Sequence, residues 1–414
     1  MATKQQEAIR YISENYLQFN RIRHDVVSDK LQIRLLDEEG KGERQEYWRE
    51  MTKQDINSIV CQCAQECDSN ITSREVMTVL QSDLVPSVHP LREYILSCRT
   101  WTKEQPDWID FVARQVKVKP SGEEAKGEEL WRECFKRWFV AMVASWMKDE
   151  VVNQQVLVLI GRQGIYKTTW LERLIPPHLR PYSCKLANTN DLNKDERMRI
   201  AEFGLIALDE IDSMNHRELN QLKSVITSSD VNERAAYAYT KERRVRLASF
   251  CASGNRRDFL TDLTGNRRWL PFEVESIQNP YFTVLPYEMM YAQAWALAQD
   301  PTFSYWFDLD EIEVLEQHNQ QFRDESNEEQ LLPILFDIPA EGKGEFFTTA
   351  QISERLVNFG NIKKPMALSR LGMVLGTAGY KATKRKIGNT QTRGWIVYQR
   401  DTDEINALRR ILKD

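Results

Sequence analysis

Residues 156–169 have the sequence Val156-Leu-Val-Leu-Ile160-Gly161-Arg-Gln-Gly-Ile-Tyr-Lys-Thr-Thr169, and the class of fold can be inferred from them. The first five residues are all apolar, which indicates a strand buried on both faces. Two glycines then mark a tight turn, and residues 170–174 continue as a helix. A strand, a turn and a helix in this order are typical of a phosphate-binding loop, in which backbone N–H groups point at phosphate oxygens.

The loop matches the pattern G-x-x-x-x-G-K-[ST] except that Tyr166 replaces the second glycine. In this pattern Lys167 reaches the β- and γ-phosphates of a nucleotide, and the Thr168 hydroxyl ligates Mg²⁺. A tyrosine still offers its backbone N–H, although a positive φ would be costly there. We therefore expect ATP and Mg²⁺ to bind at Gly161, Gln163, Gly164, Ile165, Tyr166, Lys167, Thr168 and Thr169. Taken alone, the loop could also be a strand–turn–helix junction with a chance lysine.

Three more apolar runs follow, at residues 203–208, 247–252 and 269–272. Helical segments separate them, and continuous rather than alternating apolarity is typical of parallel strands covered by helices. The predicted fold class is therefore α/β, with a parallel sheet at its centre.

Polar residues stand where these strands should end. Asp209 and Glu210 follow the second run; the first carboxylate suits Mg²⁺ coordination, and the second suits orientation of an attacking water. Asn255 follows the third run and can hold that water or the γ-phosphate. The alternative for the acidic pair is a strand end that meets solvent.

Arg267 and Arg268 directly precede the fourth run. Phosphoryl transfer gains strongly from a guanidinium that neutralises the developing charge, often one supplied by a neighbouring subunit. We expect one of the two to act in trans, with action in cis left open for the other. Surface arginines at a turn are the alternative. The candidate catalytic residues are thus Lys167, Asp209, Glu210, Asn255, Arg267 and Arg268.

The chain has 414 residues, 42% of them hydrophobic and 28% charged, which is ordinary for a globular protein of about two to four domains. No apolar run approaches the ~18 residues of a membrane span. The first residues contain no apolar segment typical of a secretory signal. We therefore expect a cytoplasmic protein with no membrane partner.

The net charge of −5 conceals two basic segments. Residues 355–400 contain ten Lys or Arg and no Asp or Glu, and residues 234–268 contain nine basic and three acidic residues. Basic patches on an acidic chain are typical of a protein that binds nucleic acid at restricted sites. A solvated basic face is the alternative for each patch.

The seven cysteines and five histidines are scattered along the chain. Cys61, Cys63 and Cys67 lack the spacing of a zinc site, and no histidine lies near them. Residues 55–67 instead read as an amphipathic helix capped by Asp55, with Cys63 and Cys67 on its buried face. The pattern favours neither a zinc hydrolase nor a histidine-based triad.

Several segments together resemble the virulence-associated E (VirE/VapE) family, and the resemblance covers roughly residues 85–300. The segments that carry it are 161–170, 208–212, 220–227, 232–237 and 264–274. Members of the family are carried by phages, genomic islands and mobile elements and resemble superfamily 3 replicative helicases. The resemblance implies an AAA+-like ATPase core, a ring that is commonly a hexamer, and work on DNA.

The superfamily also implies a hairpin between the carboxylate strand and Asn255 that projects into the channel of the ring. Residues 234–245 read as this hairpin, and Lys241 would lie at its tip. Its tyrosines could stack on the bases of a single strand. A surface hairpin with solvated charges is the alternative. The candidate contacts to single-stranded DNA are Tyr237, Tyr239, Lys241, Arg243 and Arg244.

The distribution of apolar, charged and turn-forming residues along the sequence suggests five parts. Residues 1–116 are expected to be mostly helical, 117–129 to be a linker, 130–305 to be the ATPase core, and 306–340 to be a lid or linker. Residues 341–414 have two helices followed by a basic two-stranded hairpin, the pattern of a winged-helix domain that contacts duplex DNA. A winged helix that binds protein is the alternative. The candidate phosphate contacts are Arg370, Lys384, Arg385, Lys386 and Arg393.

Together these features predict an ATP-driven DNA motor, a helicase or translocase of a phage or mobile element, that acts as a ring in replication or mobilisation. The first alternative is an ATP-binding module that anchors or regulates DNA without unwinding it; stimulation of hydrolysis by single-stranded DNA would distinguish the two. A transcription activator of the AAA+ class is disfavoured, because the sequence contains no Gly-Ala-Phe-Thr-Gly-Ala-like loop.

Overall fold

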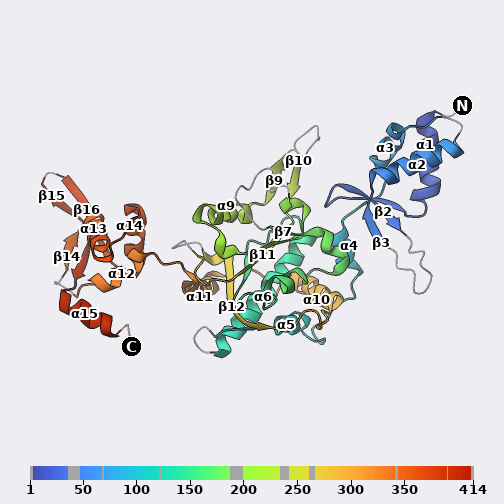
Figure 1. The fold of residues 1–414 in the computed structure, drawn as a ribbon. Helices are drawn as coiled ribbons and strands as arrows, with labels where there is room; N and C mark the ends of the chain where they lie inside the picture. Colours follow the sequence, from blue (N-terminus) through green and yellow to red (C-terminus); the bar gives the residue numbers. More distant parts are fainter. Residues whose placement is uncertain are drawn as a thin grey trace. The chain divides into compact units, whose positions relative to one another are not determined.

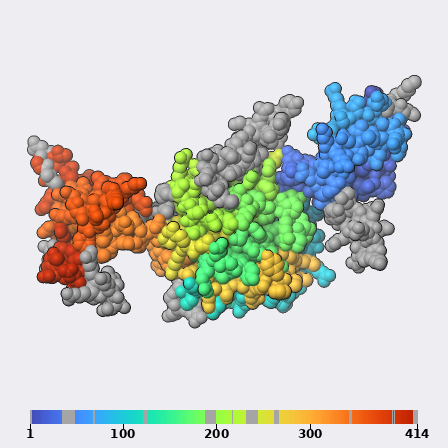
Figure 2. Space-filling view, in the orientation of Figure 1, coloured from blue at the N-terminus to red at the C-terminus, as the bar shows by residue number. Residues whose placement is uncertain are grey.

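The computed structural model of the protein describes residues 3–35, 47–67, 70–120, 124–186, 199–233, 242–260, 266–340, 344–388 and 390–411. Figure 2 shows them in colours that follow the chain. They divide into two compact units. One contains Met1–Asn255 and Trp269–Leu309, and the other contains Arg256–Arg268 and Asp310–Asp414. No helix among the described residues is both long and apolar enough to cross a membrane.

A six-stranded sheet forms the centre of the first unit (Figure 1). Its order is β5-β12-β6-β11-β8-β7, and all neighbours are parallel except β5, which pairs antiparallel with β12. Every residue of β6, β8 and β11 is buried, which confirms the prediction of a buried parallel sheet. The strands are β5 (Val116–Val118), β6 (Val156–Ile160), β7 (Ser183–Leu186), β8 (Leu205–Leu208), β11 (Ser249–Gly254) and β12 (Trp269–Ile277).

The two edge strands differ from the expectation. In β7 only Leu186 is buried, so the strand carries no apolar run. β5 lies partly within residues 117–129, which the sequence suggests to be a linker, and helix α6 (Glu124–Met147) begins there too. The prediction of a linker at residues 117–129 is therefore wrong at its start, which lies in β5, and at its end, which lies in α6. Three alternating residues are too short a signal for a strand, and charged residues are compatible with the first turns of a helix.

Helix α6 crosses the sheet and is fixed to it by tryptophans. The ring of Trp131 packs on that of Phe272 in β12, with the two ring centroids 5.2 Å apart. The indole Nε1 of Trp138 donates to the carbonyl oxygen of Phe250 in β11, and that of Trp146 donates to Gly204 just before β8, both at 3.0 Å. The buried indoles thus satisfy their only polar group on the sheet. The other helices of this unit's core are α4 (Pro90–Ser97), α5 (Trp108–Ala113), α7 (Lys167–Glu172), α9 (His216–Thr227) and α10 (Tyr287–Gln299), with 3-10 turns η2 (Pro177–Tyr182) and η3 (Ile211–Ser213).

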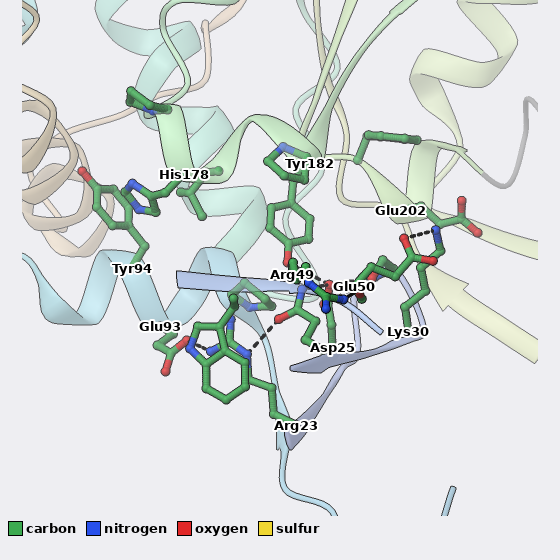
Figure 3. Close-up of a pocket in the computed structure, with 18 of the residues that line it drawn as sticks. Arg23, Asp25, Lys30, Arg49, Glu50, Glu93, Tyr94, His178, Tyr182 and Glu202 are labelled. Carbon is green, nitrogen blue, oxygen red and sulfur yellow. Dashed lines mark hydrogen bonds and ion pairs between the residues drawn. The ribbon is translucent and has the colours of Figure 1, made fainter. Parts of the chain in front are cut away.

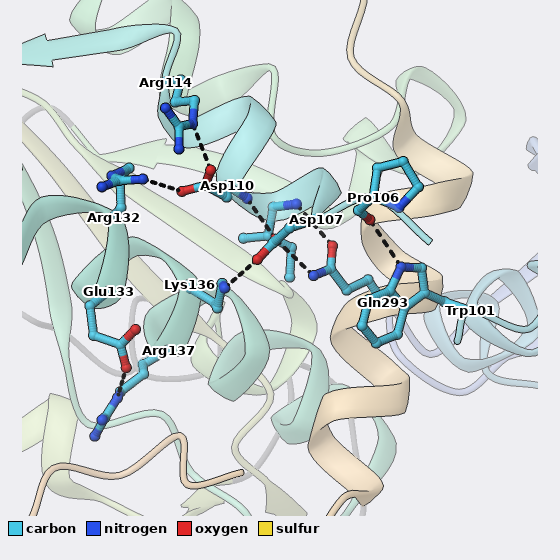
Figure 4. Close-up of polar contacts among 11 residues, drawn as sticks. Trp101, Pro106, Asp107, Asp110, Arg114, Arg132, Glu133, Lys136, Arg137 and Gln293 are labelled. Atoms are coloured by element: carbon cyan, nitrogen blue, oxygen red, sulfur yellow. Dashed lines mark hydrogen bonds and ion pairs between the residues drawn. The ribbon is translucent and has the colours of Figure 1, made fainter. Parts of the chain in front are cut away.

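A polar cluster joins α5, α6 and α10 (Figure 4). Asp107 caps α5 by accepting a hydrogen bond from the Asp110 N–H at 3.0 Å. It also accepts one from Gln293 of α10 at 2.8 Å and forms an ion pair with Lys136 of α6. Burial by itself would raise the pKa of Asp107, but the hydrogen bonds from Lys136 and its other partners outweigh burial and lower it. One carboxylate therefore holds three helices together.

Arg246 is buried between the two-stranded ribbon β9 (Asp230–Glu233) and β10 (Glu242–Val245) and the sheet. Residues 225–228 end α9, where backbone carbonyls lack helical partners. Burial lowers the pKa of Arg246 to about 9, so the side chain stays protonated at neutral pH. Hydrogen bonds from its guanidinium join the end of α9 to the residues before β11. Its guanidinium donates to the carbonyl oxygens of Ala248 (3.1 Å), Asn153 (2.8 Å), Val225 (3.3 Å), Ile226 and Ser228 (3.4 Å).

Residues before α4 form a smaller sheet with helices on it. The sheet has the order β3-β2-β1-β4, so the expectation of a mostly helical N-terminal region misses it. The strands are short and rich in charged residues, as in Ile22-Arg-His-Asp25, and therefore carry no apolar run. The elements are α1 (Lys4–Ile12), the π-helix η1 (Ser13–Leu17), β1 (Ile22–Asp25), β2 (Lys30–Leu35), β3 (Tyr47–Glu50), α2 (Lys53–Glu66), α3 (Ser73–Leu80) and β4 (Ser87–Val88).

Helix α2 has the buried face that the sequence predicts. Cys63 is fully buried and Cys67 packs against the same core, and burial raises the pKa of the Cys63 thiol to about 12. The cap differs from the prediction. Thr52 is the N-cap, and Asp55 is its partner in a capping box.

The second unit contains an antiparallel sheet in which β16 pairs with the other three strands. Its core includes Trp395, Leu356 and Leu371. The strands are β13 (Phe336–Asp337), β14 (Glu345–Phe347), β15 (Lys381–Ile387) and β16 (Thr390–Gln399). The helical elements are η4 (Asn266–Arg268), α11 (Leu309–Asn319), η5 (Gln320–Phe322), α12 (Asn327–Leu335), α13 (Thr349–Gly360), α14 (Leu368–Thr377) and α15 (Thr402–Ile411).

The boundary of the C-terminal domain lies earlier than residue 341. Leu332, Leu335 and Phe336, within the segment 306–340 expected to be a lid or linker, are buried in the core of the second unit. The acidic residues that suggest a linker stand at the start of α12, where Glu329 completes a capping box with Ser326. The charges there cap a helix rather than mark an unfolded connection.

We predict that Arg246→Leu lowers the free energy of unfolding by about 3 kcal/mol, because several buried carbonyl oxygens lose their donor. Urea unfolding followed by tryptophan fluorescence measures the change. The matched control is Arg217→Leu at an exposed position on α9, which should change the same quantity by less than about 0.5 kcal/mol. Equally small effects at both positions would contradict the role assigned to Arg246.

Candidate functional site

Two residues with unusual backbone positions shape the loop between β6 and α7. A Cβ atom on Gly161 would lie 2.9 Å from the carbonyl oxygen of Val274 in β12, so this close approach requires glycine. Tyr166 has a φ of 69°, in the left-handed region that a side chain disfavours by about 1–2 kcal/mol. The tyrosine therefore adopts the conformation of the glycine that it replaces, in spite of the cost.

Lys167 is buried beneath the loop. Its Nζ donates to the carbonyl oxygens of Gly161 (2.6 Å) and Arg162 (2.7 Å) and to Oδ1 of Asn255 (3.3 Å). Burial lowers the pKa of Lys167, and the nearby carboxylates oppose that shift. Phosphate oxygens are charged and accept hydrogen bonds more strongly than carbonyl oxygens. The ammonium is thus placed to exchange its present partners for a phosphate.

Asp209 is the centre of a second group of contacts. Its Oδ1 accepts hydrogen bonds from Thr168 Oγ1 (3.2 Å) and Ser253 Oγ (2.8 Å), and its Oδ2 forms an ion pair with Lys185 of β7 (2.7 Å). Burial by itself would raise the pKa of Asp209, but the hydrogen bonds from Lys185 and Ser253 outweigh burial and lower it. The carboxylate therefore stays ionised.

This pair of oxygen groups fits a magnesium ion. A carboxylate and a hydroxyl within 3.2 Å are hard ligands, and Mg²⁺ in proteins usually completes its shell with phosphate oxygens and water. Among the described residues, no group of three or more His, Cys, Asp or Glu could hold a metal ion. A magnesium ion at Thr168 and Asp209 would take its remaining ligands from water or from phosphate oxygens.

The remaining predicted residues of the first unit lie around the same space. Glu210 has a left-handed backbone (φ 53°) and an exposed side chain. The N–H of Asn255, at the end of β11, donates to Oδ1 of Asp212 at 3.1 Å. Gly161 and Ile165 complete the loop. The structure brings the loop, the carboxylates and the amide together at one cavity of about 370 Å³, lined by Gln163, Gly164, Tyr166, Lys167, Thr168, Thr169, Asp209, Glu210, Ser253, Gly254, Asn255 and Tyr281.

The two arginines that the sequence assigns to catalysis lie in η4, directly before β12. They belong to the second compact unit, whereas the cavity belongs to the first. Burial lowers the pKa of Arg268, and the charge of Arg267 lowers it further. Their role in catalysis stays a prediction.

The hairpin expected to enter a ring channel is described only at its base, where β9 and β10 pair antiparallel. Tyr237, Tyr239 and Lys241 lie in residues 234–241, outside the described residues, and the side chain of Arg243 is not described either. The guanidinium of Arg244 forms an ion pair with Asp29 at 2.7 Å and lies 3.8 Å from Glu202. Of these predicted DNA contacts, Arg244 is therefore engaged by acids of its own chain.

In the second unit, β15 and β16 form a hairpin that carries several exposed Lys and Arg side chains. Lys384 lies directly opposite Arg393, and like charges in such positions repel. Arg370 on α14 differs, because its guanidinium lies 4.0 Å from the carboxylate of Glu329. The hairpin, rather than α14, thus presents the stronger positive potential. Its exposed cations are Lys381, Lys384, Arg385, Lys386 and Arg393.

A larger cavity of about 1170 Å³ lies between the N-terminal sheet and the elements α4 and η2 (Figure 3). Its polar groups bind one another. The Tyr182 hydroxyl donates to Asp25 at 2.8 Å, and Arg23 forms an ion pair with Glu93 at 2.7 Å. Burial raises the pKa of Tyr182, and the charge of Asp25 raises it further.

The sequence matches the virulence-associated protein E-like domain over residues 107–325, which is more than half of the chain. The protein belongs to this family. The matched segment contains every residue that lines the cavity around Lys167. It begins at Asp107, the carboxylate that joins α5, α6 and α10.

Two solved structures align with the chain at low sequence identity. The apo structure of the NrS-1 C-terminal region (305-718) is 12% identical, with a TM-score of 0.48, and the alignment covers 95% of this chain and 99% of that chain. The A form apo structure of the same region is 13% identical, with a TM-score of 0.46 and coverage of 94% and 99%. No curated protein shows significant similarity to the sequence.

Sequence reasoning does not identify three residues at or beside the cavity, Lys185, Ser253 and Tyr281. Ser253 directly precedes Gly254-Asn255, so its place at a strand end is the signal that could have revealed it. Lys185 lies in the half-exposed strand β7, and Tyr281 lies in the segment after β12. No motif marks either residue.

We predict that the pKa of the Asp209 carboxyl rises in Ser253→Ala and rises further in Lys185→Ala. Each variant removes a hydrogen bond that lowers this pKa, and the one from Lys185 has the larger effect. A carbon-13 NMR titration of the Asp209 side chain measures the shift. An unchanged pKa in both variants would show that neither partner stabilises the ionised carboxylate.

Proposed function

We propose that the protein is an AAA+-like ATPase that moves along DNA, a helicase or translocase of a phage or mobile element that acts in replication or mobilisation. The strand order of the sheet carries this proposal. Across the sheet the parallel strands stand in the order β12, β6, β11, β8 and β7. Numbered by their order in the chain, these are the fifth, first, fourth, third and second parallel strands. The loop after the first strand, the carboxylates after the third and the amide after the fourth therefore open at the same edge.

The residues at that edge suit transfer of the γ-phosphoryl group to water. Lys167 would neutralise phosphate charge, and Thr168 with Asp209 would hold a magnesium ion that supplies further neutralisation when bound. Glu210 would orient the attacking water, and Asn255 would hold that water or the γ-phosphate. Because Lys185 and the metal would use the same carboxylate, the ion pair between Lys185 and Asp209 would have to loosen on binding.

The paired arginines support a ring. Burial lowers the pKa of Arg268, and repulsion from the adjacent guanidinium of Arg267 lowers it further. An anion such as a γ-phosphate would relieve that repulsion. We infer that Arg267 or Arg268 completes the nucleotide site of a neighbouring subunit, and that the active form is a ring, a hexamer by family resemblance.

DNA would bind at two places. The hairpin of residues 234–245 would contact a single strand in the ring channel, as the family resemblance implies. We infer that the basic hairpin of β15 and β16 contacts the phosphates of duplex DNA, as the wing of a winged helix would, because its cations are exposed. Phosphate contacts of this kind position a protein without reading the bases.

An ATP-binding module that anchors DNA without unwinding it is the second candidate. The strained Tyr166 in the loop and the ion pair that already engages Asp209 both favour slow turnover. Stimulation of hydrolysis by single-stranded DNA would favour the motor, and its absence would favour the anchoring module.

We predict that Lys167→Ala abolishes ATP binding, whereas Glu210→Gln binds ATP but hydrolyses it at least about 100-fold more slowly. The first variant removes the cation that neutralises the phosphates, and the second removes only the carboxylate that would orient water. Equilibrium binding of ATP and steady-state phosphate release, with and without single-stranded DNA, measure the two effects. Unchanged turnover in Glu210→Gln would refute its assigned role.

We predict that replacing Lys384, Lys386 and Arg393 by alanine weakens duplex binding and lowers its salt dependence. Each lost phosphate contact should reduce the slope of log K against log salt by about 0.9. Fluorescence anisotropy with duplex DNA at several salt concentrations gives that slope. The control is Lys363→Ala with Lys364→Ala, which removes two exposed charges of the same unit outside the hairpin and should leave most of the slope. Equal losses in both variants would mean that net charge, rather than the hairpin, determines binding.

A further inference from the structure

One side chain of the cavity around Lys167, that of Tyr281, has no role in the phosphate and metal binding proposed above. Tyr281 lines that cavity, although it lies in the segment that joins β12 to α10. Its side chain is 73% exposed, so a large aromatic face is open to solvent beside the loop. Aromatic side chains of this kind bind planar ring systems by stacking.

The segment that carries Tyr281 is fixed to the helix that carries Lys167. The Tyr281 N–H donates to Oδ1 of Asn279 at 3.0 Å, and Thr283 Oγ1 donates to the Asn279 carbonyl oxygen at 2.9 Å. Arg173, at the end of α7, donates to the carbonyl oxygen of Thr283 at 3.1 Å. The backbone of the segment that carries the ring is therefore held against the end of α7 before any ligand arrives.

Tyr166 provides a second contact to this ring. The rings of Tyr166 and Tyr281 are 6.2 Å apart between centroids and 81° apart in plane, an edge-to-face pair. The Asn279 amide lies 3.5 Å from the Tyr166 hydroxyl. Tyr166 holds this position with a left-handed backbone that glycine would adopt without strain. Strained residues persist mainly where they serve a function, and contact with the Tyr281 ring is such a function for Tyr166.

We propose that Tyr281, braced by Tyr166, is the surface on which the base of a bound nucleoside triphosphate stacks. The proposal rests on the proposed function, since it assumes that the triphosphate lies between Lys167, Thr168 and Asp209. The cavity of about 370 Å³ lies within the usual range of small-molecule sites. Stacking uses the face of a base and not its edge, so ATP and GTP should bind with similar affinity.

The experiment compares nucleotides with a ligand that has phosphates but no base. Titration calorimetry with Mg²⁺ measures binding of ATP, GTP and inorganic tripolyphosphate to the full chain. Tyr281→Ala should weaken ATP and GTP by about 10-fold each and leave tripolyphosphate unchanged, whereas Tyr281→Phe should bind all three like the unaltered protein. The matched control is Phe282→Ala, because Phe282 is 87% exposed and adjacent in the chain but does not line the cavity.

The possible outcomes separate this inference from the proposed function. If the unaltered protein binds ATP and Tyr281→Ala binds it equally well, the stacking proposal is wrong and the nucleotide site stands. Equal weakening of tripolyphosphate and ATP would also overturn it, because Tyr281 would then support only the phosphate loop. If the unaltered protein binds neither ATP nor tripolyphosphate, the proposed function itself fails. A similar loss in Phe282→Ala would assign the effect to the segment rather than to the ring.

Discussion

The close approach of three neighbouring strands at one edge of the sheet is the constraint on which the site depends. β6 lies between β12 and β11, and the chain that leaves it must turn in the space between them. The N–H of Gly161 donates to the carbonyl oxygen of Gly254 at 3.1 Å, while its Cα faces the carbonyl of Val274. This confinement leaves no room for a side chain at Gly161. It directs the following loop over Lys167, beside Ser253 and Asp209.

Much of that arrangement could be predicted from the sequence, because the end of a buried parallel strand is a recognisable place. Apolar runs ending in Asp209 or Asn255 predict both the strands and their shared edge. The edge strand β7 could not be predicted in this way, because only Leu186 in it is buried. The position of Lys185, which lies in the same strand, could not be predicted either. The position of Tyr281 could not be predicted for another reason. Its place beside the loop arises from hydrogen bonds between side chains and backbone of distant segments, which no local pattern encodes.

The domain boundaries show how local charge can mislead. Acidic residues before residue 341 suggest a solvated connection, yet one of them caps α12, whose apolar side is buried in the second unit. The same unit shows the opposite case. The ten cations of residues 355–400 look alike in the sequence, but Arg370 lies near Glu329, whereas Lys384 faces Arg393. Only the pairing of strands and helices shows which cation lies near an acid and which lies opposite another cation.

The buried Arg246 has a mechanical consequence. It directly follows β10 and lies three residues before β11, which ends beside Ser253 and Asn255. With its guanidinium bound to the end of α9 and to Asn153, the connection between ribbon and sheet has little slack. A pull on β10 would therefore reach β11 along the backbone instead of being absorbed by a loose connector.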